Sequence, residues 1–142
     1  MLDRAVVEDN KKSWLKVLHF INTFPDDHTW RGWKAFTLAV IQGGIDAGLD
    51  QYFRAGTSMQ HMVFSTSESH GLEQVNPAPP RVTLRRNENL EMFVCWSHSN
   101  LWFSNPEHES PVTSDDVQPV LRHYLANLWR QTRPSEPMPF KV

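Results

Sequence analysis

The segment RVTLRRNENLEMFVCWS, residues 81–97, decides the fold. Residues 81–86 alternate between apolar and polar side chains, with Val82 and Leu84 on one face of a strand. Residues 90–97 are predicted to form a second strand, with Leu90, Met92, Val94 and Trp96 on one apolar face. The polar residues NEN at 87–89 are typical of a tight turn. The segment therefore predicts an antiparallel hairpin.

The second strand of this hairpin is predicted to lie in the middle of the sheet. Phe93 and Cys95 give its other face apolar side chains as well, so both faces need cover. Two further strands are predicted around it: QHMVFST at 60–66 and the short run LWF at 101–103. Together these segments predict an antiparallel meander of about four strands.

Helical periodicity marks both ends of the chain. In the first segment, from about Asp3 to Ile21, the apolar residues Trp14, Val17, Leu18 and Ile21 fall at i, i+3, i+4 and i+7. The second helix starts near DDHTW and extends to about Ala47. It is either continuous through Gly43-Gly44 or ends at Gly43, with a new helix from Ile45. The third helix carries an apolar stripe from Val117 to Trp129 and begins at Asp115 or Pro119.

These elements predict one α+β domain over residues 1–133. Two N-terminal helices precede the antiparallel sheet, and a C-terminal helix packs with them on one face. Residues 134–142 carry prolines at 134, 137 and 139 and are predicted to form an extended tail.

The overall composition argues against nucleic acid and membranes as partners. The net charge is −2, so no strong field is present to attract nucleic acid or anionic lipid. Arg81, Arg85 and Arg86 are therefore expected on solvated faces rather than in a nucleic-acid site. The longest apolar window, residues 35–41, is too short to cross a bilayer, and we expect no membrane partner. The single cysteine, Cys95, and the charged N-terminus favour a soluble protein of the cytoplasm.

The chain lacks the common motifs of catalysis and cofactor binding. No glycine-rich phosphate loop, paired-cysteine motif or HExxH motif occurs, so no cofactor is expected. The seven histidines do not fall at the spacings that place two ligands on one helix or strand, and no metal site is expected. The run EHE at 107–109 follows Pro106 and is interpreted as a polar loop.

The strongest candidate for a site is FRAGTSMQHMVFSTSESHG, residues 53–71. Arg54 could bind an anion, Ser58 could supply a hydroxyl, and His61 could transfer a proton. His70 lies in the loop that follows, where site residues are often found. These four residues are the candidate ligand-binding residues, and His61, Ser58 and His70 are the candidate catalytic ones. The alternative is that all of them serve as caps, turn residues and core contacts.

Six tryptophans are unusual for a chain of 142 residues. Tryptophan is common both in cores and at interaction hot spots. Trp30 and Trp102 are the candidate interface residues. Together with the missing motifs, they favour a non-enzymatic intracellular protein-interaction module, such as an adaptor, chaperone or immunity-type protein. Its partner would be another protein or a second copy, bound through a tryptophan-rich face or an edge strand. The alternative is a small enzyme or small-ligand binder that uses residues 54–70.

Overall fold

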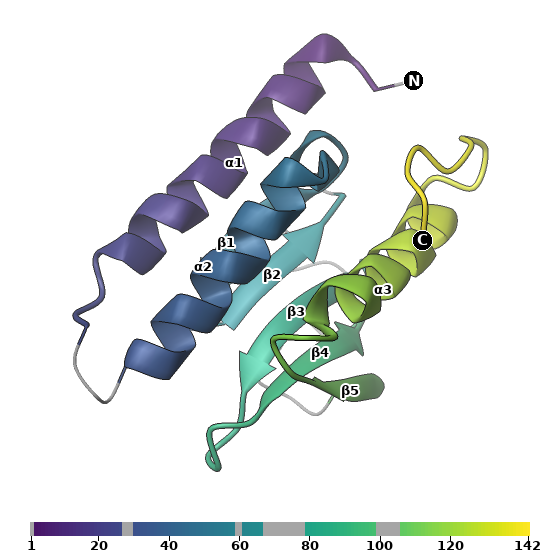
Figure 1. Cartoon of the computed structure of the whole chain (residues 1–142). Helices are drawn as coiled ribbons and strands as arrows, with labels where there is room; N and C mark the ends of the chain where they lie inside the picture. The colour runs from purple at the N-terminus through teal and green to yellow at the C-terminus, as the bar shows by residue number, and fades with distance from the viewer. Residues whose placement is uncertain (1, 27–29, 59–60, 67–78, 99–105) are drawn as a thin grey trace.

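The computed structural model describes residues 2–26, 30–58, 61–66, 79–98 and 106–142. In chain order its elements are α1 (Arg4–Asn22), α2 (Arg31–Asp46), the short 3-10 helix η1 (Leu49–Gln51), β1 (Arg54–Ser58), β2 (His61–Ser65), β3 (Arg81–Arg86), β4 (Met92–Ser97), β5 (His108–Val112) and α3 (Val117–Thr132). Figure 1 shows α2 and α3 in front of the sheet. The predicted α+β class with an antiparallel sheet is confirmed.

Neighbouring strands in the sequence are also neighbours in the sheet, in the order β1-β2-β3-β4-β5. The predicted 81–97 hairpin is confirmed, since β3 and β4 pair from Arg81 opposite Ser97 to Arg86 opposite Met92. Its turn is held by the side-chain oxygen of Asn87, which accepts hydrogen bonds from the backbone N–H groups of Asn89 and Glu91, each at 2.9 Å.

The sheet has five described strands, so the prediction of about four was wrong. The sequence RAGTS of β1 contains no alternation of large apolar residues, and it becomes a strand by pairing with β2 along its whole length. Residues 107–109 were interpreted from the sequence as a polar loop, but His108 and Glu109 begin the edge strand β5, which pairs with β4. An edge strand can be polar and can hold a proline, here Pro111. The predicted strand at 101–103 lies outside the described residues.

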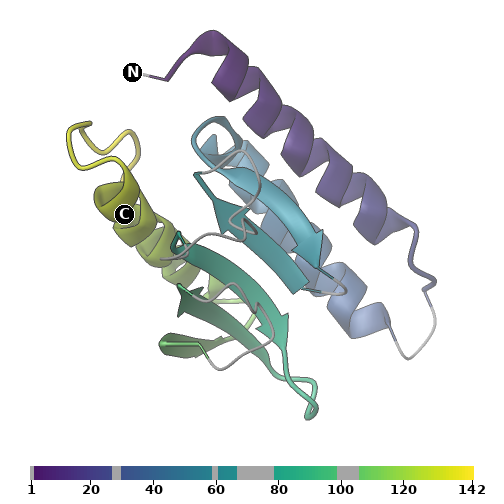
Figure 2. The ribbon, with the colours of Figure 1, turned by 180° about the vertical axis from the view of Figure 1, so that it is seen from behind.

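The two faces of the sheet differ in chemistry. The register places Phe64, Val82 and Trp96 on one face, where they join the buried core with residues of the helices. The other face carries buried polar side chains, among them Arg81 and Thr83. Figure 2 looks onto this second face, with α2 and α3 behind the sheet. The helices therefore cover the apolar face.

Helix α1 packs against α2 and along the β1 side of the sheet (Figures 1 and 2). Its predicted apolar stripe is confirmed: Trp14, Val17 and Ile21 are buried. The indole ring of Trp14 also contacts the ring of Phe64, with centroids 5.3 Å apart. Helix α1 therefore contacts both α2 and the hairpin that β1 and β2 form.

Helix α2 is continuous, and its close contact with α1 accounts for the glycine in its middle. The helix passes through Gly43 and Gly44 without a break. A Cβ atom on Gly44 would lie 2.5 Å from the indole ring of Trp14. Glycine therefore lets the two helices approach closely here, and core packing compensates for its low helix propensity.

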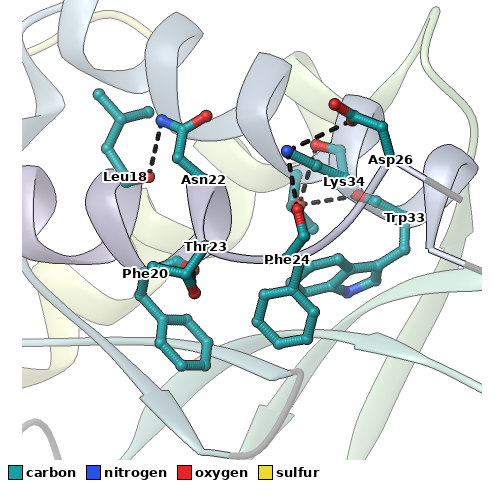
Figure 3. Close-up of polar contacts among 9 residues, drawn as sticks. Leu18, Phe20, Asn22, Thr23, Phe24, Asp26, Trp33 and Lys34 are labelled. Atoms are coloured by element: carbon teal, nitrogen blue, oxygen red, sulfur yellow. Dashed lines mark hydrogen bonds and ion pairs between the residues drawn. The ribbon is translucent and has the colours of Figure 1, made fainter.

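A side chain of α2 holds the connection between α1 and α2 in place. Lys34 of α2 donates a 2.8 Å hydrogen bond to the backbone oxygen of Phe24 and forms an ion pair with Asp26 at 3.3 Å (Figure 3). The hydroxyl of Thr23 donates to the backbone oxygen of Phe20 at 2.6 Å (Figure 3). The contacts of Lys34 thus hold Phe24 and Asp26, which follow α1, against α2, and the hydroxyl of Thr23 adds a bond at the end of α1.

The C-terminal end of the chain folds back onto the domain. Helix α3 begins at Val117, between the two predicted starts. Residues 134–142, predicted as an extended tail, contain no helix or strand. Met138 and Phe140 nevertheless pack against the core, and the ring of Phe140 stacks on Tyr52 with centroids 6.2 Å apart.

Candidate functional site

The candidate residues of the 53–71 segment occupy the first hairpin of the sheet. Ser58 ends β1 and is paired with His61, which begins β2. Arg54 stands at the other end of β1, opposite Ser65. Four residues of strand, about 13 Å at the usual rise, separate the backbone of Arg54 from that of Ser58. The fold brings Ser58 and His61 together and sets Arg54 apart. His70 lies outside the described residues.

The environment of His61 weakens it as a base. Its side chain is half-buried, and burial lowers the pKa of the imidazole, assisted by the nearby cations Arg85 and Arg86. A lower pKa means that the ring stays neutral at physiological pH but takes up a proton less readily.

The burial of polar side chains on the second face of the sheet is a feature that the sequence did not predict. Arg81, expected on a solvated face, is fully buried, and Ser65, Thr83 and Ser97 are buried on the same face. Cys95 lies among them, and burial is the main cause that raises the pKa of its thiol to about 11. A thiol with that pKa is a poor nucleophile at neutral pH.

A groove between α1 and β1 includes one predicted site residue, Arg54. Its volume is about 320 Å³. It is lined by Asp9, Lys12, Ser13, Lys16, Val17, Arg54, Ala55, Gly56, Thr57 and Val63. Gly56 has no side chain and is paired with Val63, so the strand is narrow where the groove reaches it. Glycine within a strand often marks a close approach of another backbone.

Three hydrogen bonds from α1 hold the helix alongside this strand. Asn10 donates to the backbone oxygen of Gln51 at 3.0 Å, and the indole nitrogen of Trp14 donates to that of Phe53 at 2.8 Å. The hydroxyl oxygen of Ser13 accepts from the backbone N–H of Ala55 at 2.9 Å. The helix therefore covers the edge of the sheet as far as Ala55.

Beyond this point the edge of β1 is open. Alternate residues of an antiparallel strand direct their backbone groups to the same side. The N–H of Ala55 points to Ser13, away from β2, so the backbone groups of Thr57 also point outward. Within the described part of the chain, no hydrogen bond reaches these outward groups of Thr57. The groove therefore ends at a free stretch of strand edge.

The charges around the groove are mainly positive. Lys12 and Lys16 are exposed on α1 and Arg54 is half-buried on β1, whereas Asp9 is the one acidic side chain among the described residues that line the groove. Among the described residues, none of these three cations forms an ion pair within 4 Å. The Nε atom of Arg54 is buried and has no hydrogen-bond partner in the described part of the chain. The arrangement is suited to an anionic group.

Sequence reasoning identified Arg54 but missed its two partners. Helical periodicity alone places Lys12 and Lys16 away from the apolar stripe of the first helix and indicates only that they are solvated. They share one face of α1 at i and i+4, and the sequence spacing alone predicts this. That this face meets a strand some forty residues later depends on the bond between Ser13 and Ala55.

A second cavity of about 470 Å³ lies between β5 and α3. It is lined by Trp96, His108, Glu109, Ser110, His123, Tyr124 and Asn127. The hydroxyl groups of Ser110 and Tyr124 form a hydrogen bond of 2.7 Å, which links the strand to the helix. In the described ranges no group of three or more histidine, cysteine, aspartate or glutamate side chains could hold a metal ion.

Of the two candidate interface tryptophans, the structure describes Trp30 alone. Trp102 lies outside the described residues. Trp30 is half-buried, and its ring contacts those of Phe24 and Trp33 at centroid distances of 5.0 and 5.7 Å. The guanidinium of Arg86 lies 5.4 Å from its ring centroid. Trp14, Trp33, Trp96 and Trp129 are buried in the core. Most described tryptophans therefore serve packing.

Among the described residues, no helix combines the length and the apolar character needed to cross a membrane. The chain matches no protein-family model, no curated protein and no solved structure.

Proposed function

We propose that the chain is a non-enzymatic protein-interaction module that docks its partner in the groove between α1 and β1. The observation that carries the proposal is the edge of β1 at Thr57, which no described residue covers, beside the cations Lys12, Lys16 and Arg54, which form no ion pair with a described residue. The same proposal places the protein in the cytoplasm, where the buried thiol of Cys95 would stay reduced.

A free strand edge favours a polypeptide partner. Its outward N–H and C=O groups can form the same ladder bonds with a partner strand as with a neighbour in the sheet. Because α1 already covers the edge up to Ala55, only the end of the strand near Thr57 is available. This limits the contact to a short segment and makes the helix one wall of the binding site.

Site-specific crosslinking in living cells tests the location. A photoreactive p-benzoylphenylalanine in place of Lys16 should crosslink to a partner, and the same group in place of Gln131 on α3 should not. Both residues are exposed. The K12E/K16E double variant should reduce capture of that partner, whereas R130E/K141E, with the same change of charge elsewhere, should not. Equal capture by all variants would overturn the proposal.

The second candidate function is binding of a small anion. The groove volume of about 320 Å³ falls at the lower end of the range for small-molecule sites. This alternative predicts saturable binding of citrate or inorganic phosphate in calorimetry, which should be lost in R54Q. An absence of heat with both anions would leave the protein partner as the better proposal.

A further inference from the structure

We infer that the partner segment is extended and acidic, with two carboxylate side chains separated by one residue. This inference rests on the proposed docking groove, and it names the chemistry of the partner.

The spacing of the two lysines carries the inference. Lys12 and Lys16 both line the groove from one face of α1. Four residues of helix advance by about 6 Å along its axis. Two residues of an extended chain advance by about 6.6 Å and return to the same side of the strand. An acid-x-acid pair in a strand that follows α1 therefore places one carboxylate near each lysine.

The orientation of the elements permits this match. The contacts of α1 progress along the chain from the bond of Asn10 to Gln51, before β1, to the bond between Ser13 and Ala55 within it. The helix and β1 thus run in the same direction, and Figures 1 and 2 show α1 alongside the hairpin of β1 and β2. A segment lying between them follows both at once. Its backbone can bond to Thr57 while its side chains face the lysines.

Arg54 provides a third cation from the strand side. Its Nε atom is buried at the groove, and no described residue forms a hydrogen bond with it. A buried donor of this kind is costly unless a ligand accepts from it, and a carboxylate accepts strongly from a guanidinium. One further acidic side chain or the C-terminal carboxylate of the segment would satisfy it.

The charges argue against a second copy pairing through the same strand. Two-fold pairing of β1 with β1 of another copy would bring Lys12, Lys16 and Arg54 toward their own equivalents. Like charges placed face to face oppose association. The positive groove instead complements a segment of opposite charge.

Fluorescence anisotropy with the full chain tests the inference. The probe is a short labelled peptide of alternating glutamate and threonine, and the matched control has glutamine in place of glutamate. The acidic peptide should bind saturably and weaken with added salt, and the glutamine peptide should bind at least about tenfold more weakly. K12E/K16E should cause a similar loss, and R130E/K141E should bind as the unmodified protein does.

A charge exchange provides a positive result that a merely damaged groove could not give. K12E/K16E should bind a lysine-threonine peptide more tightly than the unmodified protein does. Circular dichroism should confirm that the variant is folded.

Several results would overturn the inference. Equal binding of the glutamine peptide would remove the role of charge, and equal binding of an isomer with its glutamates in one block would remove the spacing. Displacement by equimolar citrate would indicate a small-anion site, and equal binding of a DNA oligonucleotide would indicate nonspecific attraction. A change in oligomeric mass of K12E/K16E would indicate a second copy as the occupant. If crosslinking at position 16 succeeds while the acidic peptide fails, only the acidic partner is wrong.

Discussion

His61 shows how one side chain can make stability depend on pH. Its ordinary pKa is 6.5, and burial, followed by the charges of Arg85 and Arg86, lowers the pKa in the folded protein. Below about pH 6.5 the unfolded chain therefore binds a proton that the folded chain does not. The contribution of this group to stability is complete above pH 6.5 and is lost as the pH falls toward the folded pKa.

We expect His61→Gln to flatten this part of the pH profile. The free energy of unfolding of the unmodified protein should fall more steeply between pH 7.5 and pH 5 than that of the variant. Urea denaturation at several pH values measures the difference, and His123→Gln, at an exposed position on α3, is the control. Identical slopes for the protein and the His61 variant would show that His61 does not contribute.

Cys95 should be chemically inert in the folded protein. It is 2% exposed, and burial raises the pKa of its thiol to about 11. At pH 8 about one molecule in a thousand would carry the reactive thiolate. Labelling with a thiol reagent should therefore be at least about a hundredfold slower in buffer than in denaturant. Rapid labelling of the folded chain would contradict the burial of this residue.

At the scale of elements, the glycines of α2 should respond in opposite ways to alanine. Nothing lies within 4 Å of a Cβ atom on Gly32, whereas one on Gly44 would meet the indole ring of Trp14 at 2.5 Å. Gly32→Ala should stabilise the protein by up to about 1 kcal/mol through helix propensity. Gly44→Ala should destabilise it by roughly 1–3 kcal/mol because the core must move. Urea denaturation of the two variants measures both effects. Stabilisation by Gly44→Ala would mean that α1 and α2 are less tightly packed than described.

Some strands can be predicted from their own sequence, whereas others depend on contacts with neighbouring elements. β3 and β4 carry alternating apolar residues, and their hairpin follows from the sequence alone. β1 has the sequence RAGTS and acquires its strand conformation from pairing with β2 and from the bond between Ser13 and Ala55. A pattern of hydrophobicity cannot predict a strand whose stabilising contacts are with its neighbours.

At the scale of the whole molecule, the C-terminal residues 134–142 contribute to the core. Phe140 contacts the rings of both Tyr52 and Phe53, with centroids 6.2 and 5.7 Å apart. We expect Phe140→Ala to lower the free energy of unfolding by roughly 1–2 kcal/mol, because the side chain is half-buried. Thermal or urea denaturation measures the loss, and Val142→Ala, at a 57% exposed position, is the control. Equal stability of the two variants would show that the tail does not dock.

The sequence by itself determined the α+β class, the first and third helices and the central hairpin, because periodicity and turn chemistry act over neighbouring residues. It also identified Arg54 as an anion-binding candidate, from the chemistry of its side chain. Only the tertiary structure decided the continuity of α2, which depends on Trp14 fitting against Gly44. It alone decided the burial of Arg81 and the meeting of Lys12 and Lys16 with β1. These features join residues tens of positions apart, so they depend on which surfaces pack together rather than on any local pattern.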